Sequence, residues 1–144
     1  MRIEEIGANG REKALVLVLS VFMQYEAPDY SEQGIQTFKD FIHNQKSIDM
    51  LEFYGAYRNH EIAGVIATKN NGNHIALFFV DGKYHRQGIG RKLFETVLLK
   101  STGEKITVNS SPYAVEVYKK LGFVPDRDEQ ISEGMRFTPM TYMK

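Results

Sequence analysis

The stretch from Leu51 to Val80 limits the folds open to this chain more than any other part of it. Three segments, "LEFYGAYR", "EIAGVIATK" and "HIALFFV", follow one another with only short turns between them. Their residue pattern has a period near two, which is typical of strands, and the Asn, His and Gly residues between them favour turns. Strands joined by turns this short pair antiparallel, so the sequence predicts a three-stranded meander.

A strand–helix–strand unit continues from the third of these strands, 74–80. Apolar residues at helical spacing predict a helix over 90–100, and "KITVN" at 105–109 is a short strand. A strand reached through one crossover helix usually lies parallel to the strand before it, so 105–109 is expected beside 74–80.

The flanking segments supply the remaining elements. Before the meander we expect a strand over 1–6, a helix over 11–25 and a helix from the N-cap Ser31 through Ile42. After the crossover we expect a helix from the N-cap Ser111 and Pro112 to Gly122, with Ala114, Val117, Tyr118 and Leu121 facing inward. Strands starting at Phe123 and over 134–144 complete the chain. The predicted fold class is α/β of the mixed α+β kind: a central mixed, mostly antiparallel sheet with helices on both faces. One domain is expected over 1–144.

Composition excludes several classes of function. Lys plus Arg and Asp plus Glu number 18 each, so nucleic acid and anionic membrane are not expected as main partners. The chain has no cysteine, which excludes disulfides and cysteine nucleophiles, and its four histidines lack the spacing of a metal site, so no metal is expected. A charged N-terminus and the lack of an apolar run of about 18 residues predict a cytoplasmic protein.

The junction "HRQGIGRK", at 85–92, has the properties of an anion site. The first amides of a helix have no internal acceptors and carry the positive end of the helix dipole. Gly88 and Gly90 allow a phosphate to approach the backbone, and Arg86 and Arg91 add positive charge. The stretch is predicted to hold a phosphate or pyrophosphate; the alternative is a plain turn. It lacks the spacing of a Walker A loop or of a three-glycine dinucleotide fingerprint.

Two motifs lie at a fixed separation along the chain. The first joins Val80 to the glycine turn, with Gly88 eight residues later, and the second reads S-x-x-A-x-x-x-Y-x-x-x-G-F from Ser111. Together, and with the order of the predicted elements, they resemble the GCN5-related N-acetyltransferase superfamily. The chain departs from that family's usual pattern at His85, where Arg or Gln is usual, and at Ser111, where Asn is usual.

The resemblance implies acetyl-CoA as cosubstrate, bound where strand 74–80 splays from strand 105–109. Main chain around Phe78 and Val80 would pair with pantetheine, an amide near Phe79 or Val80 would hold the acetyl oxygen, and the glycine turn would bind pyrophosphate mostly through amides. The cofactor-binding residues expected are Phe78, Phe79, Val80, His85, Arg86, Gln87, Gly88, Ile89, Gly90, Arg91, Asn109 and Ser111.

The activity implied is direct transfer of the acetyl group to a primary amine, with no covalent enzyme intermediate. Tyr118 is expected to protonate the leaving thiolate, because a phenol with a pKa of about 10 keeps its proton at neutral pH. The alternative is that Tyr118 is only a core aromatic. The general base is not defined by the sequence, and the candidates for it are Glu26, Asp29, Tyr30 and Glu52, followed by His43 and His74.

The acceptor is open among a polyamine, an aminoglycoside, an amino acid and a protein amine. The acidic stretch 24–33 corresponds to the segment that walls the acceptor site in the family, and its acids would suit a cationic amine. A non-catalytic acyl-CoA-binding or regulatory module on the same fold is the alternative to an enzyme. A homodimer is also expected, because Met140, Tyr142 and Met143 in the last strand look exposed.

Overall fold

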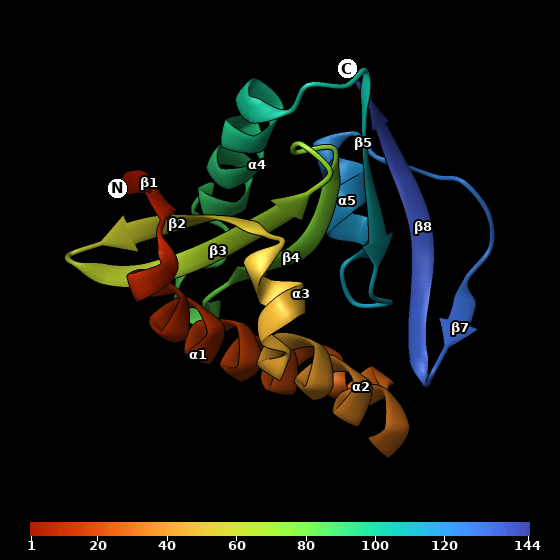
Figure 1. The fold of residues 1–144 in the computed structure, drawn as a ribbon. Coiled ribbons are helices and arrows are strands. Elements are labelled where there is room, and N and C mark those ends of the chain that lie inside the picture. The colour runs from red at the N-terminus through yellow and green to blue at the C-terminus, as the bar shows by residue number, and fades with distance from the viewer.

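The computed structural model describes residues 1–144, and most of its elements follow the predicted ones (Figure 1). The strands are β1 (Arg2–Ile6), β2 (Glu52–Arg58), β3 (Glu61–Lys69), β4 (His74–Val80), β5 (Lys105–Ser110), β6 (Val124–Pro125), β7 (Gln130–Ser132) and β8 (Met135–Met143). The helices are α1 (Arg11–Val21), α2 (Glu32–His43), α3 (Gln45–Asp49), α4 (Ile89–Lys100) and α5 (Val115–Leu121).

The strands form a sheet in the order β1-β2-β3-β4-β5-β8-β6, with β7 paired to β8. Every neighbouring pair is antiparallel except β4 and β5, which are parallel as expected for a crossover. In Figure 1, α1 and α2 lie on one side of the sheet and α4 and α5 on the other. The predicted class, a mixed and mostly antiparallel sheet with helices on both faces, is confirmed.

The parallel pair β4 and β5 is short, and this shortness positions the site. Only His74 with Thr107 and Ile75 with Val108 are in register, after which the two strands separate. The edge of β4 beyond Ile75 is therefore left without a strand partner on that side. The splay between strands 74–80 and 105–109 was expected from the family resemblance and is present.

Two apolar cores fill the space between the sheet and its helices. One lies under α1 and α2 and includes Phe22, Phe38 and Leu77, and the other lies under α4 and includes Leu93 and Phe94. Burying such side chains removes apolar surface from water, which is the main force holding both helical layers on the sheet.

The first predicted helix, over 11–25, is α-helical only as far as Val21. A π-helical turn, Phe22–Glu26, and a 3₁₀ turn, Ala27–Asp29, follow it. Periodicity near 3.6 does not distinguish an α from a π turn over so few residues. The second helix begins as predicted, because the Ser31 hydroxyl accepts from the Gly34 amide at 3.2 Å. The short helix α3 was not predicted.

The helix predicted to start at Ser111 and Pro112 starts later. Both the carbonyl and the hydroxyl of Ser111 accept from the Ala114 amide, which closes a turn ahead of α5. Pro112 therefore lies in this turn and not at the first helical position. Val117, expected to face inward, is 48% exposed. Gly122 ends the helix as predicted, with a left-handed φ of 109°.

The C-terminal strands differ from expectation in two ways. The strand after Phe123 is only β6, and the short strand β7 was not predicted. Met140, expected to be exposed, is fully buried, and Tyr142 packs against Phe123, while Met143 is exposed. The argument for a homodimer therefore loses part of its basis, and the dimer stays a prediction.

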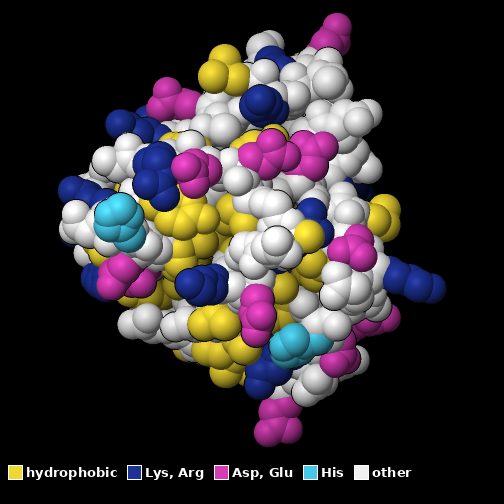
Figure 2. All heavy atoms as spheres, turned by 60° about the vertical axis from the view of Figure 1, so that its left-hand side comes forward, with side chains coloured by type: hydrophobic (Ala, Val, Ile, Leu, Met, Phe, Trp, Pro, Cys, Tyr) yellow, Lys and Arg dark blue, Asp and Glu magenta, His cyan; other side chains and the backbone are white.

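Charged side chains of both signs are interspersed on the face shown in Figure 2, with apolar side chains between them. This mixture matches the equal numbers of basic and acidic residues in the sequence. None of the helices has the length and apolar character needed to cross a membrane.

Candidate active site

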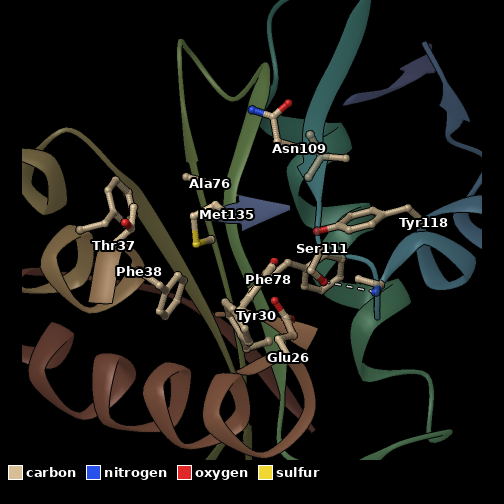
Figure 3. Close-up of a pocket in the computed structure, with 14 residues that line it drawn as sticks. Glu26, Tyr30, Thr37, Phe38, Ala76, Phe78, Asn109, Ser111, Tyr118 and Met135 are labelled. Atoms are coloured by element: carbon tan, nitrogen blue, oxygen red, sulfur yellow. Dashed lines mark hydrogen bonds between the residues drawn. The ribbon is translucent and has the colours of Figure 1, made fainter. Parts of the chain in front are cut away.

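Two cavities open where β4 separates from β5, and they share the lining residues Glu26, Phe78, Phe79, Ala114 and Tyr118. The first, called here the turn cavity, has about 400 Å³. Its other lining residues are Val21, Val80, Tyr84, His85, Arg86, Gly88, Ile89, Gly90, Tyr113, Val117 and Lys120. The second, called here the α2 cavity, has about 280 Å³. Its other lining residues are Tyr30, Thr37, Phe38, Phe41, Ala76, Val108, Asn109, Ser111 and Met135 (Figure 3).

The glycine turn before α4 forms one end of the turn cavity. Gly88 has a left-handed φ of 81°, which favours glycine, and a Cβ there would meet no atom within 4 Å. The Lys92 amide bonds to the Gly88 carbonyl, so the amides of residues 89–91 have no helical acceptor. With the positive end of the α4 dipole, these amides can bind an anion. Arg86 also has a left-handed φ, of 63°, and lines the cavity.

The free edge of β4 forms a second part of the turn cavity. The Asp81 amide donates to the Ala63 carbonyl on β3 at 2.8 Å. Because backbone groups in an antiparallel ladder alternate between the two edges, those of Phe78 and Val80 face the gap. His85 Nε2 donates to the Val80 carbonyl at 2.8 Å. The Val80 amide and both backbone groups of Phe78 are left for a bound molecule.

Two of the expected cofactor-binding side chains line neither cavity. Gln87 is exposed and hydrogen bonds to Arg58. Arg91 Nη2 donates to the Lys120 carbonyl at 3.1 Å and so ties α4 to α5. The cationic side chains that line the turn cavity are Arg86 and Lys120.

Tyr118 lies where the two cavities meet. The residue is 5% exposed, and its ring packs edge-on against Phe78 and Phe123, with centroids 5.9 and 5.3 Å away. Burial, and secondly the nearby Glu26 carboxyl, raise the pKa of the Tyr118 phenol. The hydroxyl therefore keeps its proton at neutral pH. Figure 3 shows the ring reaching from α5 into the space between the strands.

Glu26 reaches the same junction from the opposite side. It is the last residue of the π-helical turn, and Figure 3 shows its side chain near Tyr30 and Phe78. Burial raises the pKa of its carboxyl to about 7, a hydrogen bond with Ser111 opposes this, and the charge of Asp29 adds to it. A carboxyl with that pKa exchanges protons readily at neutral pH, which suits a general base.

Tyr30 and Glu26 are the two predicted base candidates that line a cavity. The Tyr30 hydroxyl donates to the Arg136 carbonyl at 3.2 Å, and burial raises its pKa, so it is poorly suited to accept a proton. The candidates that line neither cavity are Asp29, His43, Glu52 and His74. Burial lowers the pKa of His74 to about 4, and its Nδ1 lies 2.7 Å from the Thr107 hydroxyl.

The α2 cavity contains residues that the sequence analysis did not place in the site. Phe38 and Phe41 lie in the helix predicted from Ser31 through Ile42, and Met135 lies in the strand predicted over 134–144, and neither segment was predicted to line the site there. Asn109 and Ser111, expected to bind the cofactor, line this cavity and not the turn cavity. No local pattern marks Met135, because it reaches the site through the packing of β8 beside α2.

The fold, the splayed strands and the glycine turn have the arrangement that the resemblance to the GNAT superfamily implied. A family model described as "Acetyltransferase (GNAT) domain" matches residues 26–144. The chain belongs to this family. It is 28% identical over 125 residues to N-alpha-acetyltransferase 30 of Xenopus laevis, a match that covers 77% of this chain and 44% of the relative. The chain thus spans less than half of that protein.

Solved structures share the fold at low sequence identity. A GCN5-related N-acetyltransferase of Rhodopseudomonas palustris superposes with a TM-score of 0.85 at 18% identity, covering 99% of this chain and 95% of that one. The PaiA N-acetyltransferase of Thermoplasma acidophilum, in complex with coenzyme A, gives 0.75 at 17% identity with full coverage of both chains. An Elizabethkingia anophelis GNAT acetyltransferase with acetyl-CoA bound gives 0.68 at 19%, covering 99% and 97%.

Proposed function

We propose that the protein transfers the acetyl group of acetyl-CoA directly to a primary amine. The observation that carries this proposal is the meeting of the two cavities at Tyr118 and Glu26. A protonated phenol and a carboxyl with a pKa of about 7 lie at one junction, each able to move a proton there. The coenzyme A and acetyl-CoA complexes among the structural relatives support the choice of acetyl donor.

The hydrogen-bond donors and the positive charges of the turn cavity match the groups of acetyl-CoA. The amides of residues 89–91 suit the pyrophosphate, and the side chains of Arg86 and Lys120 add positive charge to this end. The backbone groups of Phe79 face β3, so those of Val80 and Phe78 are the ones open to acetyl-CoA. Val80 lies nearer the glycine turn and its amide suits the pantetheine arm, whereas Phe78 lines both cavities, so the Phe78 amide is the better donor to the acetyl oxygen.

Three groups of the chain then perform the transfer. Glu26, as the carboxylate, takes the proton from the acceptor ammonium, which frees the nitrogen lone pair to attack the thioester carbonyl carbon. The Phe78 amide stabilises the negative charge on the oxygen in the tetrahedral state. Tyr118 gives its proton to the sulfur as the carbon–sulfur bond breaks, and the nitrogen, made acidic by the attack, gives its second excess proton to the Tyr118 oxygen. Glu26 then releases the proton it took to water, so both groups return to their starting states. The products are the acetylated amine and free coenzyme A thiol.

The test is release of free thiol from acetyl-CoA in the presence of a panel of primary amines, with mass spectrometry of the acetylated product. We expect amine-dependent thiol release above the rate without amine. Calorimetry with acetyl-CoA and with desulfo-CoA measures binding independently of chemistry. Tight binding of both, with no thiol release for any amine, would contradict an enzyme and favour the non-catalytic acyl-CoA-binding module.

A further inference from the structure

The lining of the α2 cavity is mostly apolar, and much of it is aromatic. Six of its 14 lining residues are aromatic: Tyr30, Phe38, Phe41, Phe78, Phe79 and Tyr118. Met135 on β8 adds a flexible apolar side chain to the lining, and Figure 3 shows it facing Phe38 across the cavity. A ligand that fills this cavity is transferred from water to apolar surroundings, which favours binding of apolar ligands.

Glu26 is the only charged side chain among the lining residues. One ammonium group can therefore pair with a carboxylate, whereas a second would lie against aromatic rings without one. Burying an unpaired charge in such surroundings is costly. The Arg136 guanidinium, close by, pairs with Glu129 at 3.0 Å and donates to the Asp29 carbonyl at 3.2 Å, outside the lining.

The hairpin of β7 and β8 closes one side of the cavity. Its tip, Glu133 and Gly134, has left-handed φ values of 50° and 79°, as in a tight two-residue turn. The Thr37 hydroxyl of α2 donates to the Glu133 carbonyl at 2.7 Å. Gly34 and Gly134 lie so close that a Cβ on either would overlap the backbone of the other. The hairpin is thus fixed against the first turns of α2.

The size of the cavity and its few free polar groups restrict the acceptor further. About 280 Å³ lies just below the range of about 300–1,000 Å³ usual for drug-sized ligands. The hydroxyl of Thr37 is occupied by the hairpin, and that of Ser111 accepts from the Ala114 amide. The Asn109 carboxamide and the Tyr118 hydroxyl are the uncharged side-chain groups of the lining that remain for a ligand. A peptide carries more backbone donors and acceptors than these few groups can pair once acetyl-CoA occupies the edge of β4, and each buried group left unpaired costs free energy.

We propose that the acceptor is a small primary amine whose body is apolar and about the size of one aromatic ring. Its ammonium pairs with Glu26, and its body lies among Phe38, Phe41 and Met135. This inference rests on the proposed function and names the substrate class of the same site. Polyamines, aminoglycosides and peptide N-termini are disfavoured by the single acid, the closed wall and the scarcity of free polar groups.

The apolar surroundings also assist the chemistry. Burial disfavours the charged forms of the ammonium and of the carboxylate alike, so it brings the proton affinities of the two groups closer together. Transfer of the proton from the ammonium to Glu26 leaves both groups neutral. The neutral nitrogen then has its lone pair free for attack on the thioester carbon.

The experiment compares kcat/KM among acceptors by thiol release at saturating acetyl-CoA. The probes are 2-phenylethylamine, 3-methylbutylamine, ethylamine, spermidine, kanamycin and a tetrapeptide with a free N-terminus. We expect the first two to exceed ethylamine at least about tenfold, since each buried methylene adds binding. Spermidine, kanamycin or the tetrapeptide exceeding both would overturn this inference and leave the acetyltransferase standing. Absence of turnover with every amine overturns the proposed function itself.

Phe41 supplies the matched variant, because it is half-buried and lines the cavity from α2. Phe41→Ala should lower kcat/KM for 2-phenylethylamine about tenfold and leave ethylamine within about twofold. Phe41→Leu keeps an apolar side chain at this position and so disturbs the packing of α2 less. It should shift the preference toward 3-methylbutylamine. The control is Leu99→Ala, an exposed position on α4 outside both cavities. An unchanged preference in both Phe41 variants overturns the assignment.

Discussion

The two cavities that meet at Tyr118 are built in opposite ways. The turn cavity takes most of its polar groups from the main chain of one continuous stretch, 78–91. The α2 cavity takes its character from side chains on α2, β4, β5, α5 and β8. A site made of backbone groups is set by local conformation, so its residues need only permit a turn. A site made of side chains depends on packing between distant segments.

The difference has a consequence for each cavity's tolerance to mutation. In the turn cavity, side-chain truncation leaves the amides of residues 89–91 in place, and only a residue that blocks the backbone removes them. In the α2 cavity, a single side chain such as Glu26 or Phe41 carries its own chemistry. Mutations therefore separate the two cavities by which step, binding or turnover, they affect.

The largest effect is expected for Glu26→Gln, which removes the proton acceptor and keeps the shape. The turnover number kcat should fall by about 10²–10⁴-fold, while acetyl-CoA affinity in the turn cavity stays near its original value. The wild-type rate should rise with pH through about 7, as the Glu26 carboxyl loses its proton, and the variant should lack this rise. Steady-state rates from pH 5.5 to 9 measure both, and Glu52→Gln, at an exposed position outside both cavities, is the control.

The same substitution tests the cause of the raised pKa. Since the folded-state pKa of Glu26 is about 7 and its ordinary value is 4.5, the folded protein binds this proton more tightly than the unfolded chain. Its contribution to stability is full below pH 4.5 and declines as pH rises through 7. Glu26→Gln should thus exceed the wild type in unfolding free energy at pH 8, by up to about 3 kcal/mol, and match it at pH 4.5. Equal pH dependence in both proteins contradicts a buried, titrating Glu26.

Tyr118→Phe is expected to have the next largest effect. It keeps the edge-on packing against Phe78 and Phe123 and removes one donor. Loss of the proton given to the leaving thiolate should lower kcat by roughly 10- to 1,000-fold with little change in acetyl-CoA affinity. Single-turnover kinetics, where chemistry limits the rate, measures this, with Tyr54→Phe on β2 as the control. A folded variant with full kcat would leave Tyr118 as a core aromatic only.

Gly90→Val tests whether the backbone amides of the turn cavity bind the pyrophosphate. A Cβ at Gly90 would lie 3.6 Å from the Phe78 ring and 3.9 Å from Val80, so the fold has room for its first carbon. The branched side chain should obstruct the approach of phosphate to the helix amides and weaken acetyl-CoA binding on the order of tenfold or more. Arg86→Ala should weaken it less. Calorimetry showing equal affinity in the folded Gly90→Val variant contradicts binding by the amides.

The same difference between local conformation and distant packing explains which features could be predicted from the sequence. The meander, the crossover and the glycine turn were predicted, because alternation, short turns and glycine positions are local properties of the chain. The position of Glu26 depends on a π-helical turn that periodicity does not reveal. Met135 and the hairpin depend on contacts between residues near 34 and near 134, and no local pattern encodes such a contact. The burial of Met140 likewise follows from the packing of the sheet.

The smallest effect on turnover is expected from Gly34→Ala, which acts on the wall of the α2 cavity without altering its lining. The added Cβ would overlap the backbone of Gly134, so the hairpin must move away from α2 or α2 must shift. Such overpacking costs about 1–3 kcal/mol, which thermal unfolding measures as a lower Tm. A loosened wall should lower kcat/KM for 2-phenylethylamine a few-fold and leave acetyl-CoA affinity unchanged, because the turn cavity is built elsewhere. Gly7→Ala is the matched control, since a Cβ there meets nothing within 4 Å. If Gly34→Ala matches Gly7→Ala in both Tm and acceptor preference, the hairpin does not restrict the acceptor.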